Sequence, residues 1–84
     1  MNDDRAVFEA VVKAQQEHKL AALATVIETR GSVPRQAGSK MLVWPDGEIV
    51  GTVGGGQMEA YVIDEARASL RDGQTRVLTY NLSD

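Results

Sequence analysis

A glycine-punctuated stretch from Thr29 to Glu59 decides the fold of this chain: TRGSVPRQAGSKMLVWPDGEIVGTVGGGQME. An irregular loop comes first and is followed by two β-type runs, Lys40 to Trp44 and Glu48 to Val53. Pro45-Asp46-Gly47 lies between these runs and predicts a hairpin turn, because proline fixes φ and glycine leaves it free. Three successive glycines then separate the second run from a helical pattern.

Further patterns flank this stretch. Asp4 to Glu17 carries apolar residues at helical spacing and predicts a first helix, with Asn2, Asp3 and Asp4 as sources of capping oxygens. Leu20 to Thr29 is almost continuously apolar and predicts a strand covered on both faces. Gln57 to Arg71 predicts a second helix that Asp72-Gly73 ends, and Thr75 to Tyr80 predicts a last strand.

The predicted order is therefore α-β-β-β-α-β, an α+β fold with the helices packed on one sheet. At 84 residues the chain makes a single small domain. Such a domain buries only roughly 60% of the surface that its unfolded chain exposes. We therefore expect it to associate with a partner or with itself as a homo-oligomer, through exchanged or abutting strands.

Composition excludes several classes of function. The net charge of −3 gives no general attraction to nucleic acid. The absence of cysteine rules out disulfides and thiolate chemistry, and the lone His18 cannot build a metal cluster. The N-terminus begins with acids and no apolar run approaches the ~20 residues of a membrane span, so the expected compartment is the cytoplasm.

Two features of the middle stretch predict an anion site. The loop carries Arg30, Arg35 and Lys40 without any acid, and arginine forks suit bidentate contact with phosphate. The second feature is the triplet Gly54, Gly55 and Gly56 before a helix, where backbone N–H groups can bind an anion. Each feature also has a plainer interpretation. The triplet is then a tight corner, for which one glycine would suffice, and the loop is solvated, with its cations paired with Asp46 or Glu48.

Neither common phosphate motif fits. Gly38-Ser39-Lys40 has the wrong order for a Walker A loop and precedes a strand, and the glycine triplet is not Gly-x-Gly-x-x-Gly. Ser32 is a candidate hydrogen-bond donor or a turn residue. Glu59, in the first turn of the second helix, either bonds back to the backbone or accepts from a ligand N–H group.

These residues carry a family resemblance. Arg30-Gly-Ser-Val-Pro-Arg, followed by Asp46-Gly and then Gly-Thr-Val-Gly-Gly-Gly-Gln-Met-Glu59, strongly resembles the N-terminal domain of the XdhC/CoxI family. The resemblance covers nearly all of residues 1–84. It implies a chaperone that binds the molybdenum cofactor as cargo and delivers it to an apo enzyme of the xanthine dehydrogenase type, with a cysteine desulfurase as a further partner.

The resemblance has two departures. Many relatives of the carbon-monoxide-dehydrogenase branch carry cysteine where this chain has Gln57, so it implies no sulfur-carrying thiolate here. Family members also continue into a Rossmann-like domain, which these 84 residues do not include.

The leading hypothesis is a non-enzymatic factor for molybdenum-cofactor binding and insertion. Its site residues would be Arg30, Ser32, Arg35, Lys40, Gly54, Gly55, Gly56 and Glu59. One alternative is a nucleotide- or phosphate-dependent enzyme that uses the same anion site, although no convincing base or nucleophile accompanies it. Another is a structural interaction module with an incomplete ligand site.

Overall fold

The computed structural model describes residues 4–27 and 37–80, which form a helix, three strands and a second helix. The elements are α1 (Arg5–Gln16), β1 (Ala22–Thr25), β2 (Lys40–Val43), β3 (Ile49–Gly51) and α2 (Gly56–Asp72). The strands form one antiparallel sheet in the order β1-β2-β3. The predicted α+β class and the first five predicted elements are confirmed.

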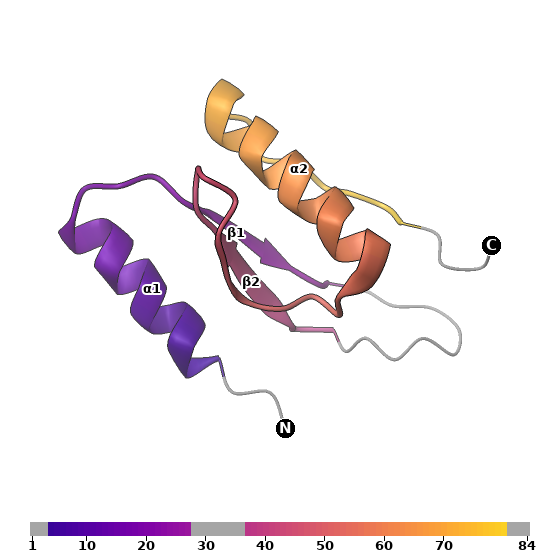
Figure 1. Ribbon diagram of the computed structural model, residues 1–84, viewed down its shortest axis with the longest axis horizontal. Coiled ribbons are helices and arrows are strands. Elements are labelled where there is room, and N and C mark those ends of the chain that lie inside the picture. Colours follow the sequence, from indigo (N-terminus) through magenta and orange to yellow (C-terminus); the bar gives the residue numbers. More distant parts are fainter. Residues whose placement is uncertain (1–3, 28–36, 81–84) are drawn as a thin grey trace.

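The sheet lies between the two helices, as Figure 1 shows. Met41 and Val43 of β2 belong to a buried cluster with Ala66 of α2, whereas Leu42 belongs to a second cluster with Val7 of α1. Successive side chains of a strand point to opposite faces, so β2 supplies the core on both sides of the sheet. The helices therefore cover opposite faces of the central strand.

The prediction for Leu20 to Thr29 was wrong about burial and length. β1 spans only Ala22–Thr25 and is an edge strand, and residues 28 and 29 lie outside the described part of the chain. Leu23 and Ile27 are 49% and 73% exposed. The two residues are an even number of positions apart, so both lie on the α1 side of the sheet. On that side, α1 packs on β2 and β3. Continuous apolarity therefore did not mean cover on both faces.

The predicted last strand, Thr75 to Tyr80, was also wrong. Within residues 37–80 this segment forms no backbone ladder with the sheet. Its side chains attach it to α2 instead: Arg76 pairs with Asp72 at 2.5 Å and Glu65 at 3.5 Å, and the rings of Tyr80 and Tyr61 lie 5.6 Å apart. A β-type composition gives a strand only where a neighbouring edge is within reach.

The hairpin turn was predicted correctly. The Gly47 N–H donates to the Trp44 carbonyl at 2.9 Å, and the Asp46 carboxylate accepts from the Glu48 N–H at 2.9 Å. From α2, the Nε of Arg67 donates to the Pro45 carbonyl at 3.1 Å, so the turn is tied to the helix above it. None of the helices in the described ranges is both long and apolar enough to cross a membrane.

Gly51 marks the closest approach between the sheet and α1. Its φ is +86°, and a Cβ built there would lie 2.5 Å from the Lys40 carbonyl oxygen and 2.6 Å from Cγ2 of Val7. Both distances are shorter than any real contact of a Cβ atom, and the carbonyl belongs to rigid backbone. Glycine is therefore required at the end of β3 by conformation and by space.

We predict that Gly51→Ala destabilises the fold by about 3 kcal/mol or more, because positive φ and overpacking act together. Gly73→Ala is the matched control: Gly73 also has positive φ, but a Cβ there would meet no atom within 4 Å. We expect the control to cost only about 1 to 2 kcal/mol. Urea unfolding followed by circular dichroism measures both changes, and equal losses would contradict the packing argument.

Candidate functional site

The candidate site is the corner between β3 and α2, where the glycine triplet lies. Gly54, Gly55 and Gly56 all have positive φ, at +124°, +80° and +69°. Gly55 precedes the helix with ψ at −175°, in a region that only glycine occupies readily. The prediction that one glycine would suffice for a plain corner was therefore wrong, because the corner by itself requires all three.

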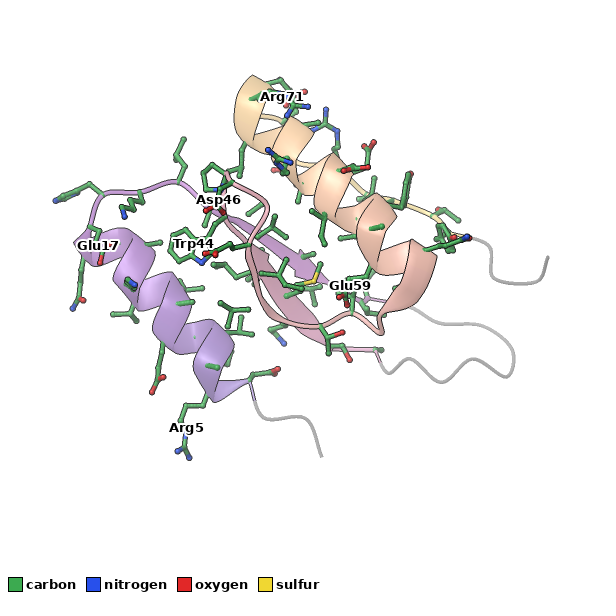
Figure 2. The ribbon with its side chains drawn as sticks, in the orientation of Figure 1. Arg5, Glu17, Trp44, Asp46, Glu59 and Arg71 are labelled. Atoms are coloured by element: carbon green, nitrogen blue, oxygen red, sulfur yellow. The ribbon has the colours of Figure 1, made fainter. Side chains whose placement is uncertain are left out.

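The Glu59 carboxylate fills the inside of this corner. Its Oε2 accepts hydrogen bonds from the Thr52 hydroxyl at 2.5 Å, the Gly55 N–H at 3.0 Å and the Val53 N–H at 3.2 Å. The Gly54 N–H donates to Oγ1 of Thr52 at 2.9 Å. The backbone-capping interpretation of Glu59 is thus confirmed. Figure 2 shows Glu59 at the start of α2, beside the chain that arrives from β3.

The protonation of Glu59 reflects this environment. Burial alone would raise the pKa of the carboxyl group. The hydrogen bonds from the Thr52 hydroxyl and from the backbone N–H groups of Gly55, Val53 and Gly54 outweigh burial and lower the pKa below its ordinary value. Glu59 is therefore a fixed negative charge at neutral pH.

Further N–H donors of the corner follow directly after those that bind Glu59. The N–H groups of Gly56, Gln57 and Met58 begin α2, where no carbonyl precedes them in the helix, and they bond to nothing else within residues 37–80. They point out of the positive end of a 17-residue helix. The glycine triplet thus offers an anion fewer amides than its sequence suggests, and the open ones belong to the first helical turn.

Lys40 lies at the start of β2, with its ammonium directed to the N-terminal end of α1. Its Nζ donates to the Gly38 carbonyl at 2.9 Å and lies 3.7 Å from Oδ2 of Asp4. It also lies 6.0 Å from the centre of the Phe8 ring. Lys40 therefore pairs with Asp4, not with an acid of the hairpin. Asp4 precedes α1 without capping it by a side-chain hydrogen bond, which corrects that expectation.

Only part of the predicted site lies in the described chain. Gly54, Gly55, Gly56 and Glu59 come together at the corner, and Lys40 is joined to it through its carbonyl, which accepts from the Thr52 N–H at 3.2 Å. Arg30, Ser32 and Arg35 lie outside the described residues. No group of acids and histidines suited to a metal ion occurs in residues 4–27 and 37–80.

Thr52 is the residue of this corner that the sequence did not single out. It stands seven positions before Glu59, at the end of a β-type run, where a threonine is ordinary. The available signal was a hydroxyl two residues before a glycine triplet that itself precedes an acidic helix start. Such a hydroxyl can bond to the backbone of the turn.

Comparison with known proteins identifies the family. The model of the XdhC and CoxI family matches residues 14–81. The chain belongs to this family. It is also similar to two curated proteins of Escherichia coli (strain K12). It is 38% identical over 71 residues to the uncharacterized protein YqeB, and 35% identical over 79 residues to the molybdenum cofactor insertion chaperone PaoD.

The matches cover this chain well and its XdhC/CoxI relatives only in part. They include 84% and 94% of this chain, but 13% of YqeB and 25% of PaoD. The resemblance noted in the sequence is therefore confirmed as family membership. What PaoD does as a whole protein comes to this chain only as a proposal.

The Glu59 contacts predict an acid-dependent stability. Because the folded-state pKa of Glu59 is lowered, its contribution is complete above the ordinary pKa of glutamate and is lost as the pH falls through the lowered value. We expect Glu59→Gln to lower the free energy of unfolding by about 1 kcal/mol at neutral pH and to make little difference in strong acid.

Denaturant unfolding across this pH range measures the effect. Glu65→Gln is the control, since Glu65 lies on the same helix and pairs with Arg76, away from the corner. A Glu59→Gln profile that coincides with that of the wild type at every pH would show that the carboxylate contributes nothing to the folded corner.

Proposed function

We propose that this chain binds the molybdenum cofactor as cargo and takes part in its insertion into an apo molybdenum hydroxylase of the xanthine dehydrogenase type. The observation that carries the proposal is the similarity to a molybdenum cofactor insertion chaperone over 94% of this chain. We further propose that it acts in the cytoplasm without catalysing a reaction of its own, with a cysteine desulfurase as an additional partner.

The chemistry of the corner is compatible with such a cargo, whose pterin carries a phosphate or a nucleotide diphosphate. The open N–H groups of Gly56, Gln57 and Met58 are donors suited to phosphate oxygens. The hydrogen bonds from Thr52, Val53 and Gly55 all go to Oε2 of Glu59, so Oε1 can receive N–H donors of a pterin ring. Donors and an acceptor thus occur side by side, as a ligand with both kinds of group requires.

The proposed site also includes three residues that are inferred from the sequence: Arg30, Ser32 and Arg35. An arginine pair in a glycine- and proline-containing loop can neutralise a phosphate bidentately, and Ser32 can add a hydroxyl donor. Lys40 would add positive charge at the strand that follows this loop, although its ammonium is paired with Asp4 in the structure. The loop cations carry the larger share of the proposed charge neutralisation.

The direct test is to purify the chain from cells that make the cofactor and to measure bound molybdenum and pterin. We expect both in a constant ratio to protein. Molybdenum and pterin at background levels, in a chain that still binds the apo hydroxylase, would instead support the alternative of an interaction module. Turnover of a nucleotide or phosphate ester would support the enzyme alternative.

We predict that Arg35→Ala weakens cofactor binding by about 1.5 to 3 kcal/mol, the range for a charge-assisted hydrogen bond. Arg71→Ala is the control for lost charge, because Arg71 lies at the opposite end of α2 from Glu59 (Figure 2). Titration at low salt measures both affinities. Unchanged affinity for Arg35→Ala would remove this residue from the site.

We also propose that the chain associates with itself. Phe8 and Val12 on α1 are about half exposed, and Leu23 and Ile27 leave apolar surface on the α1 side of the sheet. Association would cover this surface. We predict a dimer or larger assembly by light scattering at micromolar concentration, and a shift to monomer in Leu23→Lys. A wild-type chain that is folded and strictly monomeric would contradict this.

A further inference from the structure

Thr52 links two parts of the corner, since its hydroxyl contacts both Glu59 and the glycine triplet. Oγ1 lies 2.5 Å from Oε2 of Glu59 and 2.9 Å from the Gly54 nitrogen. The backbone N–H can only donate and the ionised carboxylate can only accept. The single hydroxyl proton must therefore point to Glu59, and an oxygen lone pair must face Gly54.

This arrangement fixes the corner from the strand side. The Thr52 N–H donates to the Lys40 carbonyl at 3.2 Å, so the residue that carries the hydroxyl is itself attached to β2. The Glu59 side chain lies on the first turn of α2 and has three rotatable bonds that a hydrogen bond can restrict. The Thr52 hydroxyl is the side-chain donor among three that hold its carboxylate inside the loop, and the N–H groups of Val53 and Gly55 are the other two.

We propose that Thr52 is a positioning residue: by holding Glu59 in the glycine loop, it determines which amides of the corner face a ligand. With Glu59 in place, the amides of Val53 and Gly55 are occupied and those of Gly56 to Met58 remain open. Without the hydroxyl, the carboxylate moves outward and the inner amides are released. This rests on the proposed function, because it specifies how the same corner meets the phosphate of its cargo.

Electrostatic repulsion between Glu59 and an anion supports the same role for Thr52. A carboxylate inside the loop repels an anion that approaches the inner amides, and it occupies their hydrogen-bond capacity. A phosphate therefore binds at the outer turn of α2, while the second carboxylate oxygen of Glu59 remains available to an N–H donor on the same ligand. Thr52 thus acts on the ligand only through Glu59 and the loop.

Two substitutions at this exposed position separate the hydroxyl from the shape of the side chain. Thr52→Val keeps the branched shape and removes the hydroxyl, and Thr52→Ser keeps the hydroxyl. By NMR titration, Thr52→Val should raise the pKa of Glu59, because a hydrogen bond to the charged form is lost. Amide exchange at Gly55 should become about tenfold faster. Thr52→Ser should restore both values.

Inorganic pyrophosphate serves as the anion probe, with amide chemical shifts as the readout. In the wild-type chain the shifts should centre on Gly56 to Met58, and in Thr52→Val they should extend to Val53 and Gly55. An unchanged Glu59 pKa and unchanged Gly55 exchange in Thr52→Val would overturn the proposal. Shifts confined to Gly56 to Met58 in both proteins would also overturn it.

The two proposals fail in different ways. If pyrophosphate and cofactor bind neither protein while the Glu59 pKa and Gly55 exchange respond to Thr52→Val, the positioning role stands and the cargo-binding function fails. If cofactor binds both proteins and neither the pKa nor the exchange responds, the function stands and the role of Thr52 fails.

Discussion

The burial of β2 on both faces is the constraint on which the rest of this structure depends. Met41 and Val43 are fully buried toward α2, and Leu42 is almost fully buried toward α1. A strand with no solvent face requires a helix on each side, and each helix is then located by the residues it places over β2. The loops between them, including the glycine corner, are positioned by this packing.

The local elements of the fold could be predicted because their signals are periodic. The helical spacing of α1 and α2, the Pro45-Asp46-Gly47 turn and the end of α2 at Gly73 all agree with the sequence to within a residue or two. Burial could not be predicted in the same way. Leu23 has a fully apolar neighbourhood in the sequence, yet its exposure depends on where α1 crosses the sheet, which periodicity does not encode.

The same limit applies to the candidate site. The glycine triplet and Glu59 were identified from the sequence, and they do come together. The sequence left open whether Glu59 would bond back to the backbone or accept from a ligand, and it did not indicate that Lys40 would turn toward Asp4. Both are choices of partner among several charges within reach, and such choices depend on the three-dimensional arrangement of the elements, not on spacing along the chain.

The positive φ angles of the glycine triplet have a consequence for the speed and selectivity of any encounter at this corner. The three glycines lose their conformational entropy when the chain folds. The hydrogen bonds to Glu59 then hold the loop before a second molecule binds. Association then requires little further ordering of this backbone, so a complementary molecule docks without waiting for a rearrangement. A rigid corner also discriminates by shape, since it cannot adjust to a molecule whose polar groups are spaced differently.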